Sequence, residues 1–103
     1  MAAAQTSPIA AVSAIIVKDG SVLLVKRAAE PNKGLWAFPG GRIELGESAR
    51  EAVVREVREE TSVVVDVGDV VDVRDVITGP PGHVEHHYVV VNFRAAFISG
   101  ELK

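Results

Sequence analysis

The segment GESAREAVVREVREETS, residues 46 to 62, constrains the fold more than any other part of the chain. Ser48 and Glu51 form the S-x-x-E pattern of a capping box, which predicts a helix from just after Ser48 to about Thr61. At about 100° per residue, one face of this helix is apolar and should meet a core. The residues of that face are Ala49, Ala52, Val53 and Val57.

Acidic residues interrupt the same apolar face. Glu56 and Glu60 fall inside it and Glu59 lies at its edge, whereas Arg50 and Arg58 lie on the other side. Buried carboxylates are unfavourable and neighbouring ones repel, so each would tend to take up a proton unless a cation lies among them. This phasing indicates a metal site. The alternative is a solvated helix with surplus acid, but solvated charges should keep to the outer face.

Composition limits the class of protein. The chain has 103 residues, which is the size of one domain, with 48% hydrophobic and 24% charged residues, as in a globular protein. It contains no cysteine, which excludes disulfides and thiolate metal ligands and suits a reducing cytosol, so we expect a cytoplasmic protein. A net charge of −3 argues against a nucleic-acid polymer as partner, because such surfaces are basic.

The ends and the longest apolar run also carry predictions. The start MAAAQTSP has neither a basic nor an apolar segment, so residues 1–8 should form a flexible tail and not a signal peptide. The run IAAVSAIIV is too short to cross a membrane as a helix, so we expect no membrane association. Residues 9–103 are then expected to form one domain.

Alternating and β-branched segments predict the strands. Residues 8–17 and 21–27 should form an antiparallel hairpin across the turn at Asp19 and Gly20. Short extended pieces are expected at 35–39 and 42–45, separated by Gly40 and Gly41, which permit unusual dihedrals and close approach to a ligand. Residues 63–79 should form one or two strands, and 86–98 a long, largely buried strand. Together these predict an α/β domain.

The acidic segment has a recognisable spacing. The chain matches the pattern G-x5-E-x7-R-E-U-x-E-E-x-G-U, in which U is a bulky aliphatic residue, at eight of its nine specified positions. The matching residues are Gly41, Glu47, Arg55, Glu56, Val57, Glu59, Glu60 and Val63. The segment therefore resembles the Nudix box of the Nudix hydrolases, and GLWAFPGG and LLVKR extend the similarity over most of residues 9–100.

One position departs from the pattern, because Ser62 replaces the final glycine. That glycine follows the helix, where a left-handed C-cap is common, so serine there should cost about 1 kcal/mol if its φ is positive. Since Ser62 follows the last acidic residue, we expect an altered helix exit more than lost chemistry.

The resemblance implies a fold and an activity. It implies an α/β/α sandwich whose mixed sheet carries the box helix on one face, and we expect the second, C-terminal helix to be missing, because no second segment reads as an amphipathic helix. It also implies Mg²⁺-dependent hydrolysis of a nucleoside diphosphate linked to another group, with Mn²⁺ as an alternative cation. The chemistry agrees, because divalent cations reconcile carboxylates with a negatively charged pyrophosphate.

By position, the resemblance also assigns roles to residues. Glu56 and Glu60 would be the principal metal ligands, Glu59 a further ligand and the favoured general base, and the Gly40 carbonyl a backbone ligand. Arg55 would pair with Glu47 to brace the loop before the helix. The base could instead come from a later loop, where Glu101 is the available acid.

Other side chains carry open alternatives. Lys26, Arg27 and Arg42 could hold phosphate or be surface charges. Trp36 and Phe38 could be core residues or could stack on a base or ribose. The histidines of HVEHH could suggest a metal cluster, but neighbours on a strand point to opposite faces, so a structural or substrate-facing role is favoured.

The substrate and the assembly are the last expectations. LWAFPGGRIELGES and HHYVVVNF resemble small bacterial ADP-ribose pyrophosphatases most, and Pro80 lies near the downstream proline of such enzymes, so ADP-ribose is favoured over oxidised or ordinary nucleoside triphosphates, the MutT-like alternative. A silent Nudix-like domain that senses nucleotides is the non-enzymatic alternative. Without a second helix, the other face of the sheet should be partly bare. We expect either that a C-terminal portion is lacking or that two chains cover each other's bare face in a homodimer.

Overall fold

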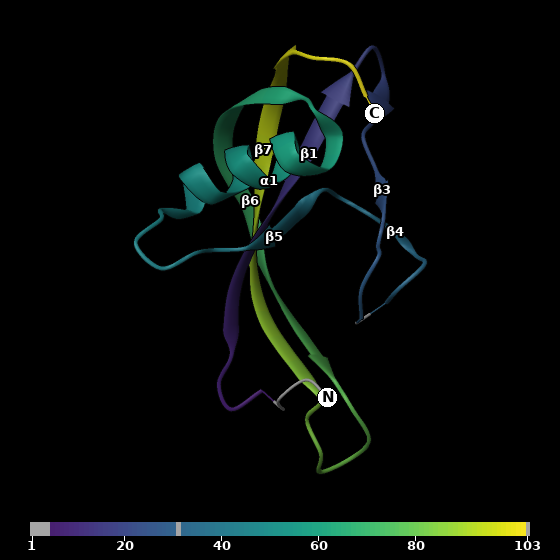
Figure 1. The fold of residues 1–103 in the computed structure, drawn as a ribbon, viewed down its shortest axis with the longest axis vertical. Helices are drawn as coiled ribbons and strands as arrows, with labels where there is room; N and C mark the ends of the chain where they lie inside the picture. Colours follow the sequence, from purple (N-terminus) through teal and green to yellow (C-terminus); the bar gives the residue numbers. More distant parts are fainter. Residues whose placement is uncertain (1–4, 31, 103) are drawn as a thin grey trace.

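The computed structural model describes residues 5–30 and 32–102, arranged as a mixed sheet with a helix packed on it (Figure 1). Residues 1–4, which are half of the predicted tail, lie outside the described residues. The elements are β1 (Ile9–Lys18), β2 (Ser21–Val22), β3 (Val25–Lys26), β4 (Trp36–Ala37), β5 (Gly40–Arg42), α1 (Ala49–Thr61), β6 (Val64–Thr78) and β7 (His86–Ser99). This is the predicted α/β class.

The sheet has β1 and β7 at its centre. Its order is β2-β1-β7-β6, and β5 also pairs with β1. β1 and β7 are parallel, from Ile9 opposite Tyr88 to Val17 opposite Ala96, whereas β6 and β7 form an antiparallel ribbon with irregularities between Val64 and Asp72. In Figure 1, α1 lies over one end of the sheet and the β6–β7 ribbon runs on beyond it.

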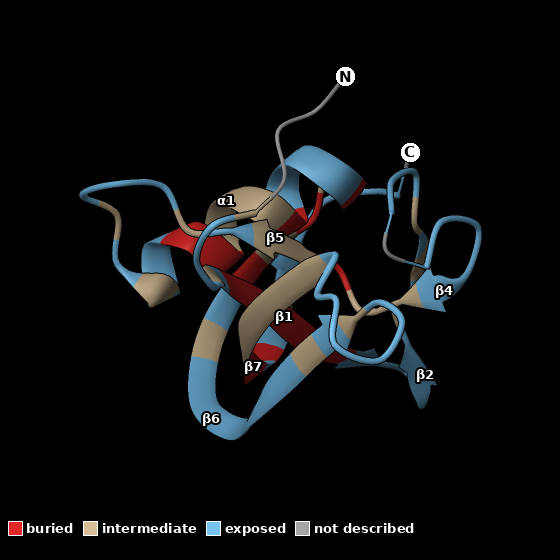
Figure 2. Cartoon of the chain, turned by 90° about the horizontal axis from the view of Figure 1, so that it is seen from below, coloured by how far each residue is buried: buried red, intermediate tan, exposed pale blue. Residues whose placement is uncertain are grey.

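The core lies between α1 and the sheet. Ala52, Val53 and Val57 of the predicted apolar face are completely buried against the even-numbered residues of β1 and the odd-numbered residues of β7 (Figure 2). The helix begins at the predicted Ser48 cap, whose side chain accepts a hydrogen bond from the backbone N–H of Glu51, 3.1 Å away. The 3.6-residue period of the sequence therefore determined both the helix and its buried face.

Several predicted strands differ in the structure. The Asp19–Gly20 turn forms, with φ values of 51° and 78°, but the strand predicted at 21–27 is divided into β2, which pairs with β1, and β3, which pairs with β4. The strand predicted at 42–45 is wrong in position, because the pairing with β1 runs over Gly40–Arg42. The prediction at 63–79 is realised as one long strand, β6.

β7 is also less buried than its apolar sequence predicts. Only Asn92, Phe93 and Ala95 are buried, because α1 covers just part of this strand. On the face opposite α1, the residues towards the C-terminal ends of β1 and β7 form what we call the open face: Ile15, Val17, Arg94, Ala96 and Ile98. Val17 and Ile98 are 55% and 58% exposed, so the expected bare face is present in the described part of the chain.

Within residues 5–30 and 32–102, α1 is the single helix. It has 13 residues, and none of the described helical structure is long and apolar enough to span a bilayer. The described end of the predicted tail is held in place, because the side-chain oxygen of Gln5 accepts a hydrogen bond from the backbone N–H of His87, 2.5 Å away.

Candidate functional site

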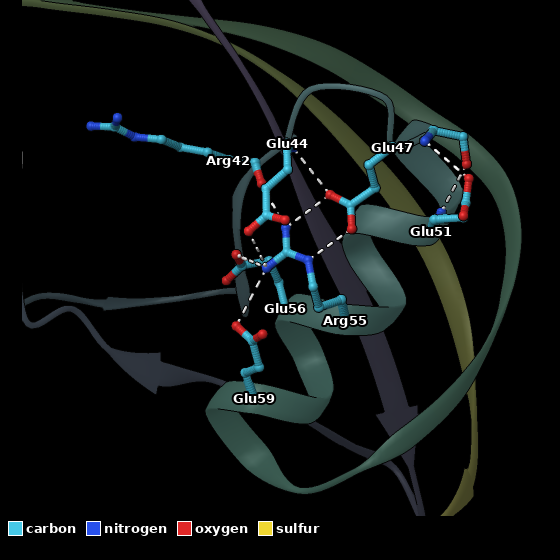
Figure 3. Close-up of polar contacts among 8 residues, drawn as sticks. Arg42, Glu44, Glu47, Glu51, Arg55, Glu56 and Glu59 are labelled. Carbon is cyan, nitrogen blue, oxygen red and sulfur yellow. Dashed lines mark hydrogen bonds and ion pairs between the residues drawn. The ribbon is translucent and has the colours of Figure 1, made fainter.

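Arg55 is the centre of a charged cluster on the inner edge of α1 (Figure 3). Its Nε and Nη2 atoms donate to the two oxygens of Glu47, at 2.7 and 2.9 Å, so the pair is bidentate. Nη1 donates to Glu56 at 2.7 Å and to Glu59 at 3.3 Å, and Nη2 also donates to the carbonyl oxygen of Arg42 at 3.0 Å. The ion pair implied by the resemblance is therefore formed, and Arg55 also contacts two of the candidate metal ligands.

This cluster shifts the pKa values of both partners. Hydrogen bonds from Arg55 and from the backbone of Glu44 lower the pKa of Glu47 to about 2. The same hydrogen bonds to Glu47 and Glu56 raise the pKa of Arg55 above its usual range. Both groups are therefore charged at neutral pH, and they fix the turn at residues 44–48 to the helix.

Glu56 and Glu60 lie one helical turn apart and form a pair of adjacent carboxylates. The pKa of Glu60 is raised to about 7, first by desolvation and then by the charge of Glu56, while a hydrogen bond from the Gly40 backbone N–H opposes the shift. At neutral pH Glu60 is therefore about half protonated, and a divalent cation could replace that proton. Oxygen donors are the ligands that Mg²⁺ prefers, so the residues present fit such an ion.

The four predicted metal ligands are only partly brought together. Glu56 and Glu60 adjoin each other beside the backbone of Gly40, and Glu56 is half-buried, but Glu59 and Glu60 are both exposed and Glu59 engages Arg55. Within the described ranges, no three acidic, histidine or cysteine side chains gather into a cage that could hold a metal. The carboxylate pair is therefore the part of the predicted site whose geometry is already formed.

Gly40 and Gly41 are required for close packing. Neither has a positive φ, so the unusual dihedrals expected from the sequence are absent. A Cβ on Gly40 would lie 2.0 Å from the carbonyl oxygen of Val12, and a Cβ on Gly41 would lie 2.4 Å from the carboxylate of Glu56. The two glycines thus let β5 lie against β1 on one side and against the carboxylate pair on the other.

A cavity of about 480 Å³ begins at these glycines and extends along the sheet face opposite α1. It is lined by four of the predicted substrate-binding residues, Arg27, Trp36, Phe38 and Arg42. Trp36 is 66% exposed, so the core alternative for this residue is wrong, whereas Phe38 is half-buried. In Figure 3 the side chain of Arg42 points away from the Arg55 cluster, and Arg42 is one of the residues that line the cavity.

The sequence was compared with those of known protein families. The profile of the NUDIX domain family matches residues 7–102. The chain belongs to the Nudix family.

Individual relatives of this Nudix chain agree with the assignment. It is 42% identical over 96 residues to an ADP-ribose pyrophosphatase of Methanocaldococcus jannaschii, covering 93% of this chain and 55% of that protein. It is 49% identical over 61 residues to a CTP pyrophosphohydrolase of Escherichia coli, covering 58% of this chain and 45% of that one. The Nudix chain thus spans about half the length of these curated relatives.

Solved structures place the fold in the same family. A MutT NUDIX hydrolase from Burkholderia pseudomallei superposes with a TM-score of 0.83 and 34% identity, covering 94% of this Nudix chain and 73% of that one. The mixed sheet with one packed helix is therefore the arrangement of a Nudix domain.

Three polar residues of the site were missed by sequence reasoning. Ser13 and Asn92 are 8% and 5% exposed, and both line the cavity. The hydroxyl of Ser13 donates to the side-chain oxygen of Asn92, and the side-chain nitrogen of Asn92 donates to the carboxylate of Asp72. One signal was available, because an asparagine within the apolar run YVVVNF must find hydrogen-bond partners if it is buried.

The remaining predicted residues lie elsewhere. His86 is half-buried, its Nδ1 lies 2.9 Å from the Thr78 hydroxyl and its ring stacks on Tyr88, which agrees with a structural role. Glu101 is exposed after the end of β7.

Proposed function

We propose that this Nudix domain hydrolyses the pyrophosphate of a nucleoside diphosphate linked to a second group, with ADP-ribose as the favoured substrate. The observation that carries the proposal is the Glu56–Glu60 carboxylate pair: Glu56 lies against Gly41 and Glu60 beside the Gly40 backbone, and both glycines also line the aromatic- and arginine-lined cavity. A cavity for a nucleotide and a cation site for its phosphates would thus be contiguous.

Glu56, Glu59, Glu60 and the Gly40 carbonyl would hold the cation, which we propose to be Mg²⁺, with Mn²⁺ as a substitute. When bound, a divalent cation polarises a phosphoryl group and stabilises the charge that develops on it. Arg55 acts as a positioning residue, because its hydrogen bond to Glu56 fixes that carboxylate while its bidentate pair with Glu47 fixes Arg55 itself.

Glu59 is the proposed general base. Its carboxylate is exposed and accepts one long hydrogen bond from Arg55, 3.3 Å, so it is accessible to a water molecule. A proton would pass from water to Glu59 as the water oxygen bonds to phosphorus and the bridging oxygen leaves with the other phosphoryl group. ADP-ribose and water would give AMP and ribose 5-phosphate.

The cavity residues would hold the rest of the substrate. Arg27 and Arg42 line the cavity near the glycine corner, where they can pair with phosphate oxygens. Trp36 and Phe38 present aromatic rings to the same space, where they can stack on the base or ribose. We also retain the cytoplasmic location as a prediction from composition.

The decisive experiment incubates the protein with ADP-ribose and Mg²⁺ and measures AMP and ribose 5-phosphate by chromatography. Glu59→Gln and Glu60→Gln should each lower kcat by at least about 100-fold. Glu51→Gln is the matched control, because it removes one acid from the outer face of the same helix while glutamine keeps the capping box. Turnover that survives the loss of both Glu59 and Glu60 would contradict the mechanism.

The main alternative substrate is a nucleoside triphosphate, which the similarity to a CTP pyrophosphohydrolase favours. A panel of nucleoside triphosphates and ADP-ribose, assayed by phosphate and pyrophosphate release, distinguishes the two substrate classes. Nucleotide binding without turnover of any member of the panel would support a sensor instead.

A further inference from the structure

The floor of the cavity is a chain of hydrogen bonds across three neighbouring strands. Ser13 of β1 lies opposite Asn92 of β7, and Asn92 lies opposite Asp72 of β6. All three are on the face opposite α1, and the two nearly buried members line the cavity. The sequence separations are 79 and 20 residues, so this chain of contacts exists only in the folded protein.

The direction of these hydrogen bonds is fixed from one end. A carboxylate can only accept, so Asp72 must face the NH₂ group of Asn92, and the amide oxygen of Asn92 must then face Ser13. The Ser13 hydroxyl therefore donates to Asn92. Asp72 thus prevents the Asn92 amide from rotating so that its oxygen and nitrogen exchange positions.

The hydrogen-bond donors and acceptors that these contacts leave unused also have a fixed arrangement. The Ser13 oxygen keeps its lone pairs, the Asn92 oxygen keeps one lone pair, and the Asn92 nitrogen keeps one N–H. The floor therefore accepts hydrogen bonds on the β1 side and donates on the β6 side. A ligand that buries this floor without matching it leaves polar groups unpaired, which is unfavourable.

We propose that Asp72, acting through Asn92 and Ser13, determines which nucleobase the cavity prefers; this inference rests on the proposed function. The preferred bases present an amino group beside a ring nitrogen, and the disfavoured bases present a carbonyl beside a ring N–H. An asparagine amide pairs in this way with the amino group and ring nitrogen of adenine. The aromatic side chains of Trp36 and Phe38 on the cavity wall suit a planar base. Adenine and cytosine have the matching order, whereas hypoxanthine and uracil have the reverse order.

The test compares nucleotides that differ only in the hydrogen-bonding groups of the base. For the wild-type protein with Mg²⁺, kcat/KM for ADP-ribose should exceed that for inosine diphosphate ribose by about 10- to 100-fold. Calorimetric binding of AMP and IMP provides a readout that does not require turnover, and it should show the same order. Equal affinities for AMP and IMP in the wild-type protein would overturn the proposal.

Two variants separate the role of Asp72 from a general charge effect. Asp72→Asn can present either an oxygen or a nitrogen to Asn92, so the preference should fall to less than about threefold. Asp75→Asn removes the same charge from the same strand, but Asp75 lies opposite Val89 and so faces away from the cavity. It should keep the full preference, and thermal unfolding verifies that both variants are folded.

The outcomes are distinguishable from failure of the proposed function. If no nucleotide is hydrolysed but AMP still binds better than IMP, the hydrolase is wrong and the selection by the cavity floor stands. If ADP-ribose and its inosine analogue are hydrolysed equally well, the hydrolase stands and the selection is wrong. A preference that persists in Asp72→Asn also overturns the role of Asp72.

Discussion

Replacing each of the two adjacent glycines by alanine should separate activity from stability. In Gly41→Ala, the new Cβ would lie 2.4 Å from the Cδ and Oε2 atoms of Glu56, whereas ordinary contacts begin near 3.4 Å. The carboxylate must therefore move by about 1 Å, which a flexible side chain can do. Because φ at residue 41 is not positive, the backbone should tolerate alanine, and stability should change by less than about 1 kcal/mol.

The displacement of the Glu56 carboxylate in Gly41→Ala should lower catalytic activity instead. A shift of about 1 Å in a group that holds the reacting centre can lower the rate by about 100-fold, so kcat/KM should fall by roughly that factor. Steady-state hydrolysis of the best substrate in saturating Mg²⁺ measures the loss, and thermal unfolding measures stability.

Gly40→Ala is the matched comparison, one residue away on the same strand. Its Cβ would lie 2.0 Å from the Val12 carbonyl oxygen and 2.7 Å from the Ser13 Cα, and neither backbone atom can move away by changing rotamer. Overpacking of this kind costs about 1–3 kcal/mol, which lowers Tm by roughly 5–20 °C in a domain of this size. The reasoning is refuted if Gly41→Ala keeps wild-type kcat/KM or loses as much Tm as Gly40→Ala.

Four further predictions follow from particular contacts. Ser62→Gly should raise stability by about 1 kcal/mol, measured by thermal unfolding with activity unchanged, because Ser62 has φ 67° at the helix C-cap. The pKa of Glu47 is lowered to about 2, so its contribution to stability is present above about pH 4.5 and is lost as pH falls towards 2. In Glu47→Gln the free energy of unfolding should therefore depend less on pH between about 4.5 and 2. The pKa of Glu60 is raised to about 7, so without metal its contribution to stability is present below about pH 4.5 and is lost as pH rises through 7. Accordingly, Mg²⁺ should stabilise the protein more at pH 8 than at pH 6, and Glu60→Gln should abolish that difference in thermal shift. Light scattering at micromolar concentration should give the mass of a homodimer that covers the open face, and a stable monomer would exclude it.

Much of the site was predictable because its contacts are local in sequence. The capping box joins residues three apart, and the acidic residues recur at the spacing of one helical turn, so the helix and the side of it that carries these carboxylates follow from periodicity. The bidentate pair of Glu47 and Arg55, eight residues apart, followed from the family spacing. The altered helix exit expected at Ser62 is wrong, because Ser62 keeps a left-handed C-cap with φ 67° and its backbone N–H donates to the carbonyl oxygen of Arg58.

The strand boundaries were less predictable, because they depend on which segments become neighbours. Residues 21–27 have the composition of one strand, yet β2 and β3 pair with different partners and the strand is divided. Gly40 and Gly41 were expected to separate two extended pieces and to have unusual dihedrals, whereas pairing with β1 makes them part of a strand. Propensity alone does not contain this information, since a strand is completed by hydrogen bonds to a distant segment.

The sequence by itself determined the helix, the face it buries and the acidic residues beside that face, since a helix closes its own hydrogen bonds within four residues. Only the tertiary structure decided that Gly41 lies against Glu56, that Trp36 faces a cavity, and that Ser13, Asn92 and Asp72 meet on its floor. A sheet draws its neighbours from anywhere in the chain, so the polarity of that floor is fixed by strand register, which no local pattern of residues specifies.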